Sequence, residues 1–366
     1  MPELDSVRGI AILGVVFLHG FYWPYSSLHF NRPAHIFIQL TQPGWTGVNL
    51  FFVLSGFLIT GILLDSVGRT NYYKRFYMRR VLRILPAYYA VLILLLILRR
   101  SSLAYFGLSF VYLSNVTNLF GVPQFYGPLW SLAVEEHYYL FWPAIVRRLS
   151  SRGLALSALG VCVLVPLVRA VSFSLGFTRN LGTYTWCVAD GLAAGSLLAI
   201  ILRTSITRQN IRRLCASLLG LTLILATVAS PLGILTRNRL LGAAFQYSLI
   251  NLGCSGALLL VLLLGTSSWA RFVNWSWLRF FGYISYGLYL IHLLIFSLYD
   301  TICAKIWPGL LPTSGQFGVV VLRFGVAGGL AVGASYLSRK YFEERFLRLK
   351  HRIESNGPPE LAGMAA

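Results

Sequence analysis

Long apolar segments alternate along this chain with short gaps that hold most of its charged residues. Ten of these segments contain close to the ~20 apolar residues that an α-helix needs to cross the hydrocarbon core of a bilayer. They cover residues 7–24, 44–64, 81–98, 128–146, 153–173, 181–202, 214–235, 240–264, 279–299 and 316–338. The pattern predicts an all-α, polytopic integral membrane bundle of about ten transmembrane helices.

An eleventh apolar region, residues 103–120, differs from the other ten. It carries four polar side chains close together, namely Ser114, Asn115, Thr117 and Asn118. Polar side chains are costly in lipid unless they face protein or water. We therefore expect a re-entrant segment, or one that lies at the outer surface, and we take Asn115 as a candidate substrate contact.

The composition and charge agree with a membrane protein. The chain is 57% hydrophobic and 11% charged, with a mean hydropathy of +0.69, whereas an ordinary soluble domain is about 25% charged. The net charge of +20 does not indicate nucleic-acid binding, because the basic residues lie in separate gaps and form no continuous stripe. With ten spans, 22 of the 31 basic residues fall on the side that holds both termini. The positive-inside rule makes that side the cytoplasm.

The chain is expected to form one membrane domain over residues 1–352, followed by a polar cytoplasmic tail at 353–366. The tail contains a Gly-Pro-Pro run and few large apolar residues, which is typical of a disordered segment. The five cysteines are odd in number and show no CxxC spacing. This argues against both a disulfide framework and a metal site.

Two adjacent carboxylates, Glu135 and Glu136, lie inside the apolar segment 128–146. A charge at such a depth costs at least a few kcal/mol unless it is paired or protonated, so it is a functional candidate. Successive residues of an α-helix point about 100° apart. Glu135 therefore shares its face with Ser131 and Tyr138, whereas the face of Glu136 is mainly apolar. We take Glu135 as a candidate catalytic residue, and Ser131 and Tyr138 as candidate substrate contacts.

Arg8 and His19 form a second constellation, in the first apolar segment. Eleven residues are close to three helical turns, so both side chains are expected on one face, about 16 Å apart along the axis. A lone histidine in an apolar helix is more often a packed, hydrogen-bonded core residue than a catalytic one. Its shared face with Arg8 and the presence of Glu135 favour a catalytic role for His19.

The densest basic cluster of the chain, at residues 74–83, includes Arg80 and Arg83. Side chains three residues apart are neighbours on a helix, and two guanidinium groups so placed can grip phosphate oxygens. The alternative is that they are ordinary cytoplasmic anchors. We expect Arg80 and Arg83, together with Arg8, to bind a phosphate-bearing co-substrate.

A polar stripe follows the segment 279–299, where Tyr286 and His292 are candidate substrate contacts. A hydrogen-bond network that links helices explains this stripe equally well. Asp190 is a weaker candidate, because the nearby Gly191 and Gly195 can be explained by close packing of helices.

Five motifs occur along the chain in a fixed order. They are Leu4-Asp5-Ser6-Val7-Arg8-Gly9-Ile10-Ala11 with His19, then residues 47–58 (GVNLFFVLSGFL), the Arg-Arg-x-x-Arg-Ile-x-Pro run at 79–86, Trp-Ser-Leu-x-Val-Glu-Glu at 130–136, and Ser-Tyr-x-x-Tyr-Leu-x-His at 285–292. Together they resemble the integral-membrane acyltransferase-3 family over about residues 4–300. Asn49 and His137 depart from the common pattern, in which Asp and Gln stand at these positions.

This resemblance implies an acyl-CoA-dependent O-acyltransferase of the bacterial inner membrane, with acetyl-CoA as the expected donor and no metal. Its acceptor is expected to be a hydroxyl of a glycan, a lipid-linked sugar or a related molecule. A hydroxyl needs a positioned base near neutral pH. His19 can serve as that base if Glu135 or another carboxylate orients it, while Arg8, Arg80 and Arg83 hold the acyl-CoA. A covalent intermediate on His19, Ser131 or Tyr138 is an open alternative.

Two other classes of function remain open from the sequence. A multi-pass transporter of a glycan or lipid precursor would also have about ten spans, although it should show internal repeats or paired broken helices. A non-catalytic membrane scaffold or glycan-binding protein is the other class. Consumption of acyl-CoA by the purified protein separates the enzyme from both.

Overall fold

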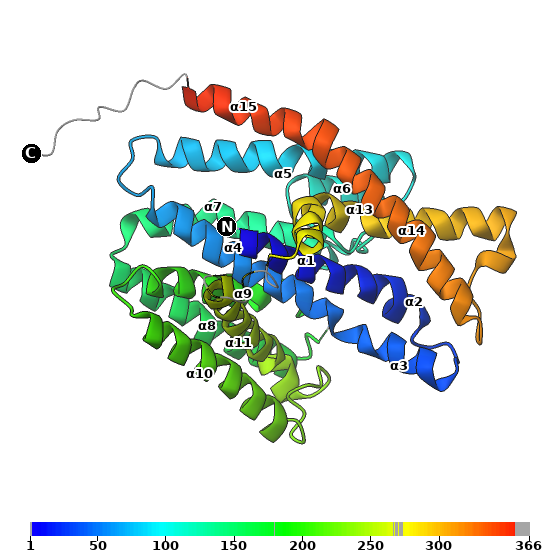
Figure 1. The fold of residues 1–366 in the computed structure, drawn as a ribbon, viewed down its shortest axis with the longest axis horizontal. Helices are drawn as coiled ribbons and strands as arrows, with labels where there is room; N and C mark the ends of the chain where they lie inside the picture. Colours follow the sequence, from blue (N-terminus) through cyan, green and yellow to red (C-terminus); the bar gives the residue numbers. More distant parts are fainter. Residues whose placement is uncertain (1, 179, 266, 268–269, 271–273, 356–366) are drawn as a thin grey trace, which may run out of the picture.

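The computed structural model of the chain describes residues 2–178, 180–265, 267, 270 and 274–355, and these residues form helices without strands (Figure 1). The longer helices are α1 (Pro2–Phe17), α4 (Thr46–Leu64), α5 (Tyr72–Ile97), α7 (Leu129–Arg148), α8 (Ser151–Ser174), α9 (Thr185–Ile201), α10 (Arg208–Val228), α11 (Leu240–Gly265), α13 (Ser276–Ile306) and α14 (Phe317–Leu337). The shorter ones are η1 (Leu18–Tyr22), α2 (Trp23–Tyr25), α3 (Arg32–Leu40), η2 (Gln42–Trp45), α6 (Leu103–Phe110), η3 (Thr117–Phe120), η4 (Pro308–Leu310), η5 (Ser338–Glu343) and α15 (Glu344–Ser355).

Each of the ten segments expected to span the membrane overlaps one long helix. Segment 7–24 continues from α1 through η1 and α2, and α10 begins six residues before segment 214–235 and ends seven residues before that segment does. Within the described part of the chain, eight helical stretches are long and apolar enough to cross a bilayer. The other two expected spans are α9, which is apolar but has 17 residues, and α7, which has 20 residues and carries Glu135 and Glu136. The protein is therefore a polytopic helical membrane protein, as the sequence predicts.

Three polar contacts between helix ends agree with helices that alternate in direction along the chain. Arg203, just after α9, donates to Asp65 at the end of α4 with an N–O distance of 2.8 Å. At the opposite ends, the Gly315 amide before α14 donates to the His29 carbonyl at 2.8 Å, and Arg100 after α5 donates to Thr301 near the end of α13 at 2.6 Å. These pairs join ends that the ten-span topology places on the same side.

The region 103–120 does not cross the bundle as a helix. Its helix α6 has eight residues, which corresponds to about 12 Å, against the ~30 Å of a hydrocarbon core. A full span here would also have reversed every later helix, and Arg203 could then not reach Asp65. The side chain of Asn115 instead donates to Thr185 at the start of α9, at 2.9 Å.

Helix α1 is the centre of the bundle and packs against α13 on one side and α4 on another. The contact with α13 is close because Gly9 lies against the Leu278 carbonyl and Gly282 lies against the Asp5 carbonyl. A side chain at either glycine would collide with backbone, so the two helices approach only because both lack a Cβ. Figure 1 shows α8, α10 and α11 grouped below α4, while α5 and α15 run side by side at the top.

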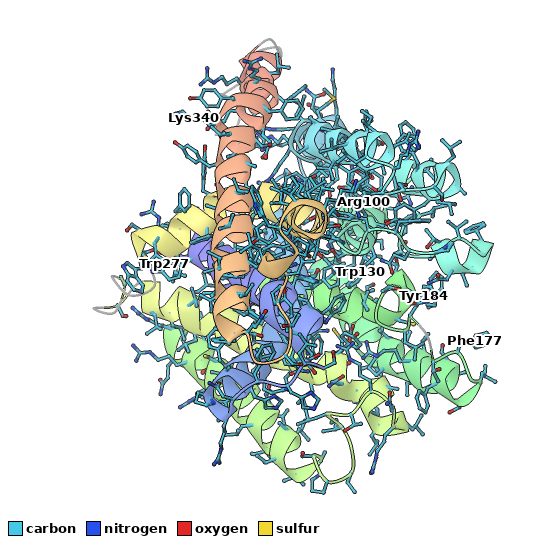
Figure 2. All side chains as sticks on the ribbon, turned by 90° about the vertical axis from the view of Figure 1, so that its right-hand side faces the viewer. Arg100, Trp130, Phe177, Tyr184, Trp277 and Lys340 are labelled. Carbon is cyan, nitrogen blue, oxygen red and sulfur yellow. The ribbon has the colours of Figure 1, made fainter. Side chains whose placement is uncertain are left out.

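The periphery of the bundle carries apolar and aromatic side chains that point away from the protein. Figure 2 shows Phe177 and Trp277 on the outside, and they are 67% and 40% exposed. Such exposure suits contact with lipid, and tryptophan is common where membrane and water meet. The basic Lys340, in η5 and also at the periphery (Figure 2), is exposed as well.

The expected tail at 353–366 falls mainly outside the described residues. Helix α15 continues to Ser355, so the first three residues of that range are helical. Residues 356–366 lie outside the described part of the chain.

Candidate active site

A cavity of about 190 Å³ lies between α1, α4, α5, α7 and α13. Its polar lining residues are Arg8, Ser55, Arg80, Arg83, Ser131, Glu135, Tyr139, Ser285, Tyr286 and Tyr289, and apolar side chains such as Val48, Phe51 and Ile59 complete its wall. Six of these polar residues were singled out from the sequence. This arginine cavity therefore unites Glu135 with Arg8, Arg80 and Arg83, although the four residues come from three different helices.

Glu135 is the carboxylate that faces the arginine cavity, as the helical-face argument predicts. Its Oε1 accepts a hydrogen bond from the Ser55 hydroxyl at 2.7 Å, and its Oε2 accepts one from the Tyr139 hydroxyl at 3.2 Å. Tyr139 lies one helical turn after Glu135, so it covers the same face. Two donors hold the carboxylate group in a fixed orientation.

The three arginines differ in how completely they are paired. Arg8 donates to Asp5 on its own helix, at 2.5 Å. Arg80 stacks against the rings of Phe76 and Tyr139, and its buried Nε has no hydrogen-bond partner among the described residues. Arg83, three residues further along α5, is exposed. The cavity thus carries an excess of positive charge, and part of its hydrogen-bonding capacity is unused.

Glu136 points elsewhere, and its surroundings differ from those of Glu135. It does not line the arginine cavity, and its buried Oε1 has no hydrogen-bond partner in the described part of the chain. Buried polar atoms are normally paired, and an unpaired one calls for an explanation. The two adjacent carboxylates therefore occupy distinct environments, as expected from their 100° separation.

Two hydroxyl groups meet in the wall of the cavity. Ser131 of α7 and Tyr289 of α13 lie 2.7 Å apart through their side-chain oxygens, and Phe51 of α4 packs edge-on against the Tyr289 ring. Tyr286, one turn earlier on α13, donates to the Ile84 carbonyl of α5 at 2.7 Å. These contacts fasten α13 to both α7 and α5 around the cavity.

His19 does not lie in this cavity and does not bond to Glu135. It belongs to η1, a π-helical turn that follows α1, and its Nδ1 lies 2.8 Å from the Val15 carbonyl and 3.2 Å from His292 Nε2. Trp23 packs edge-on against the ring. The pairing of His19 with Glu135 that the sequence suggests is thus replaced by a pair of histidines.

Tyr138 and Asn115 lie apart from the cavity. The hydroxyl of Tyr138 contacts Thr60 at 3.1 Å and Ser196 at 2.5 Å, so it joins α7 to α4 and α9. Asn115 bonds to the backbone and side chain of the segment before α9. Their assignment as substrate contacts stays a prediction, and in this structure both link elements of the fold.

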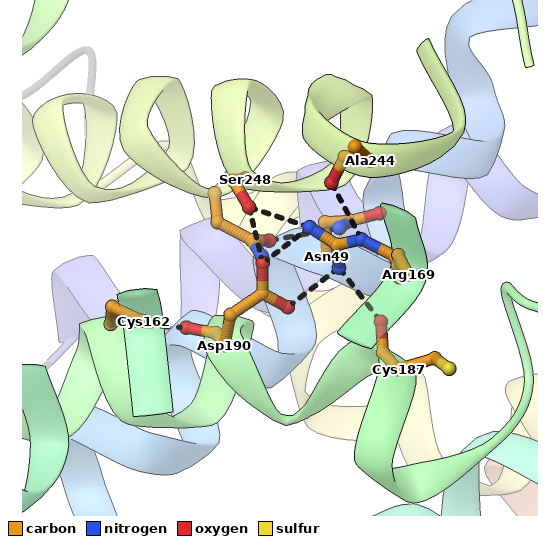
Figure 3. A network of polar contacts seen from close by, with 8 residues as sticks. Asn49, Cys162, Arg169, Cys187, Asp190, Ala244 and Ser248 are labelled. Carbon is orange, nitrogen blue, oxygen red and sulfur yellow. Dashed lines mark hydrogen bonds and ion pairs between the residues drawn. The ribbon is translucent and has the colours of Figure 1, made fainter. Parts of the chain in front are cut away.

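A second charged group, buried inside the bundle, surrounds Arg169 of α8 and Asp190 of α9 (Figure 3). Figure 1 shows these two helices on the opposite side of α4 from α5. Arg169 donates to both Asp190 oxygens at 3.2 and 3.1 Å, to Ser248, and to the carbonyls of Ala244 and Cys187. Every nitrogen of the guanidinium is bonded. Asp190 is thereby part of a structural ion pair, and Gly195 allows α9 to approach the Val53 carbonyl of α4.

Sequence reasoning missed Ser55, Tyr139 and Arg169. Ser55 is the one hydroxyl in the apolar run Phe51–Phe57, and Tyr139 lies at the i+4 position from Glu135. Arg169 is a single charge inside the apolar segment 153–173, which is a signal for a buried functional or structural residue. Among the described residues, no group of three or more His, Cys, Asp or Glu side chains could hold a metal ion.

Comparison with known proteins places the chain in a family. The acyltransferase-3 family model, described as an acyltransferase domain, matches residues 1–337. This chain belongs to the acyltransferase-3 family. The resemblance of its five motifs is confirmed, and the family match covers all ten long helices and the residues of the cavity.

Relatives of this acyltransferase-3 protein include two proteins named for peptidoglycan O-acetylation. Peptidoglycan O-acetyltransferase OatA of Listeria monocytogenes is 25% identical over 359 residues, covering 88% of this chain and 54% of OatA. YrhL of Bacillus subtilis, whose name assigns it provisionally to the same activity, is 28% identical over 325 residues, covering 80% of this chain and 48% of YrhL. The chain thus spans about half the length of these curated relatives.

A further relative, from Staphylococcus aureus, matches a shorter part of the chain. A protein of strain MSSA476, provisionally named an O-acetyltransferase, is 32% identical over 167 residues, which is 40% of this chain and 24% of that protein. No solved structure matches the chain significantly.

Proposed function

We propose that this protein is a membrane O-acyltransferase that moves an acyl group, acetyl in the first instance, from cytoplasmic acyl-CoA to a hydroxyl of a glycan, a lipid-linked sugar or a related acceptor. One observation carries the proposal: Arg8, Arg80 and Arg83 converge with Glu135 on one cavity inside a membrane bundle. Family membership favours this enzyme over the transporter that the sequence leaves open.

The arginines are proposed to bind the phosphate groups of acyl-CoA. Arg80 and Arg83 are neighbours on α5, and Arg8 approaches from α1. The Nε of Arg80, unpaired among the described residues, is available to an anionic ligand, and a charge-assisted hydrogen bond from arginine to phosphate is about twice as strong as a neutral one. Glu135, held by Ser55 and Tyr139, is the candidate group that orients the bound donor.

The transfer step is assigned to His19. Its ring takes the proton of the acceptor hydroxyl as that oxygen attacks the thioester carbonyl carbon. The carbon–sulfur bond then breaks, and the departing CoA sulfur recovers the proton from His19. Arg8 and His19 lie about 16 Å apart along the helix axis, a separation that the thin acyl-bearing arm of CoA would have to bridge.

The proposed sidedness follows from charge. With both termini in the cytoplasm of a bacterial inner membrane, the α4, α5 and α9 ends that hold Asp65, Arg69 and Arg203 face the donor. His19 then lies toward the opposite side, from which the acceptor arrives. The names of OatA and YrhL favour a cell-wall or related glycan as the acceptor.

Release of CoA thiol in membranes that contain the native acceptors tests the proposal. With acetyl-CoA as the probe, His19→Ala is expected to lower the rate about 100- to 10,000-fold, since that is the usual effect of losing a general base. Glu135→Ala should also abolish transfer. Glu136→Ala, the matched control on the neighbouring position, should retain more activity because Glu136 does not line the cavity.

Membrane insertion of all three variants is checked by their yield in the membrane fraction. Near-normal acetyl transfer by the His19→Ala protein would overturn the mechanism. Failure of the unaltered protein to consume any acyl-CoA would overturn the function.

A further inference from the structure

His19 and His292 form a pair of imidazole rings, and no carboxylate of the described residues bonds to either ring. The two rings lie 5.1 Å apart between centroids, with His292 Nε2 3.2 Å from His19 Nδ1. We propose that His292 is a positioning residue for acyl transfer, which together with the Val15 carbonyl holds His19 in the tautomer whose Nε2 is free to take the proton of the acceptor. This inference rests on the proposed function of His19 as the base.

The hydrogen bonds of His292 fix where its own proton lies. Its Nδ1 is 2.9 Å from the Leu288 carbonyl and 3.0 Å from the Tyr289 carbonyl. A carbonyl oxygen only accepts, so Nδ1 must carry the hydrogen. In a neutral imidazole the other nitrogen is then an acceptor. His292 therefore presents the lone pair of Nε2 toward His19.

The same reasoning fixes His19. Its Nδ1 lies 2.8 Å from the Val15 carbonyl, so this nitrogen also carries a hydrogen, and that hydrogen is shared between the carbonyl and His292 Nε2. Both acceptors lie on the Nδ1 side of the ring. The Nε2 of His19 is consequently the nitrogen with a lone pair, as a general base requires.

His292 can act on His19 in the charged state as well as in the neutral one. When His19 accepts a proton at Nε2, its Nδ1–H becomes a stronger donor, and the lone pair of His292 is in place to receive that bond. This is the role that a carboxylate plays in a serine protease triad, here given to a neutral ring. Glu135 is not needed for it, because Glu135 is held by Ser55 and Tyr139 in the arginine cavity.

The surroundings of the pair keep both rings in place. His292 is completely buried, and Phe296, one turn later on α13, packs edge-on against it. Trp23 packs edge-on against His19. The backbone bonds of His292 involve only Nδ1, which leaves its Nε2 to His19.

Two substitutions of His292 separate positioning from packing. In His292→Gln, an amide oxygen can take the position of the imidazole Nε2, so that His19 keeps a hydrogen-bond acceptor. His292→Asn, the matched control, keeps a short amide that can donate to the α13 carbonyls but cannot reach His19. We expect His292→Asn to lower kcat at least about 10-fold, which is part of the roughly 100- to 10,000-fold effect of a general base. The KM for acetyl-CoA should stay unchanged. His292→Gln should recover most of the lost kcat.

A spectroscopic measurement gives a readout that does not depend on activity. The chain has six histidines, and selective ¹⁵N labelling with His19→Ala as the assignment reference identifies the His19 signals. In the unaltered and His292→Gln proteins two acceptors should hold the Nδ1–H tautomer at His19, whereas His292→Asn leaves the Val15 carbonyl alone on that side of the ring and should show a larger share of the Nε2–H tautomer.

The outcomes are distinguishable. Equal kcat for the Asn and Gln variants, or an unchanged His19 tautomer in His292→Asn, would overturn the positioning role while leaving His19 as the base. Full activity of His19→Ala would instead overturn the proposed mechanism itself, and the inference with it.

Discussion

Two charged groups on opposite sides of α4 differ in the completeness of their hydrogen bonds. Around Arg169, all guanidinium nitrogens are bonded to Asp190, Ser248 or backbone carbonyls (Figure 3). Around Arg80, the Nε is buried without a partner among the described residues, and the side chain faces a cavity of about 190 Å³. A charge that is fully paired inside the bundle joins helices, whereas one that is incompletely paired beside a cavity has room for a ligand.

The same distinction applies to the acidic members of each group. The carboxylate oxygens of Asp190 accept hydrogen bonds from Arg169 and Ser248, and Asp190 does not line the arginine cavity. Glu135 instead accepts from two neutral hydroxyls, those of Ser55 and Tyr139. The arginines near Glu135 therefore keep positive charge that can attract an incoming anion. The Arg169 group has no such excess charge.

The largest expected effect is on the stability of the Arg169 group. Arg169→Ala leaves Asp190 buried without its partner, and breaking a buried ion pair in this way typically costs about 3–5 kcal/mol. Thermal unfolding in detergent should show a clear loss of stability. Replacing both residues together, Arg169→Met with Asp190→Leu, should recover much of it because no buried charge remains.

Unchanged stability of Arg169→Ala would break the comparison, since a ligand-binding arginine and a structural one would then behave alike. A double variant as unstable as the single one would point instead to the carbonyl contacts of Arg169 as the source of the stability.

A smaller effect is expected at the arginine cavity, and it concerns binding. Arg80→Ala and Arg83→Ala should each weaken acetyl-CoA binding roughly 10- to 150-fold, the equivalent of about 1.5–3 kcal/mol for a hydrogen bond to a charged group. Lysine at either position should restore only part of the affinity, because it lacks the planar, two-pronged geometry of arginine. Isothermal titration of the detergent-solubilised protein measures both.

Arg203→Ala is the control for these variants. Arg203 pairs with Asp65 at the surface, with 35% and 67% of the two side chains exposed, and such pairs contribute little. Its acetyl-CoA affinity should equal that of the unaltered protein. The same affinity in all three alanine variants would make the cavity arginines topological anchors.

The smallest expected effect concerns the reactivity of single cysteines placed in the loops. It sharpens the comparison because it shows toward which side of the membrane the arginine cavity opens. After removal of the five native cysteines, cysteines at Gly68 and Gly153 should be protected from an impermeant thiol reagent in intact cells. Cysteines at Ser27, Pro123 and Gly309 should react. A Cβ added at Gly68 or Gly309 would meet no other atom of the described residues within 4 Å, so these two substitutions fit without a clash.

The opposite labelling pattern, with Gly68 reactive and Gly309 protected, would place the arginine cavity toward the outside. Acyl-CoA, a cytoplasmic molecule, would then be unable to reach it from its own side.

The positions of the ten long helices could be predicted because a bilayer imposes a length on each apolar run. Segments such as 153–173 and 240–264 differ from α8 and α11 by at most two residues at either end. The grouping of their ends could also be predicted, since each helix reverses the direction of the one before. The sequence alone does not contain the lateral order of the helices, and so the approach of α5 to α7 became visible only in the structure.

The candidate site was predictable where one helix decides the geometry. The separation of Glu135 from Glu136 follows from 100° per residue and is found in the structure. The partner of His19 was not predictable in this way, because it is set by the packing of α1 on α13 and by a local departure from α-helical geometry. Tyr138 was expected beside Glu135, but its hydroxyl contacts Thr60 of α4 and Ser196 of α9, and Tyr139, at the i+4 position, contacts Glu135 instead.

The π-helical turn at Leu18–Tyr22 makes the site sensitive to insertions and deletions. A π turn holds one residue more than an α turn and is often found at functional positions. Deleting Gly20 would return this turn to α-helical geometry and rotate the next segment of the chain by about 100°. His19 would keep its bond to Val15, but Trp23 would be carried away from its ring. In this segment the number of residues, and not only their identity, decides which side chain lies beside His19.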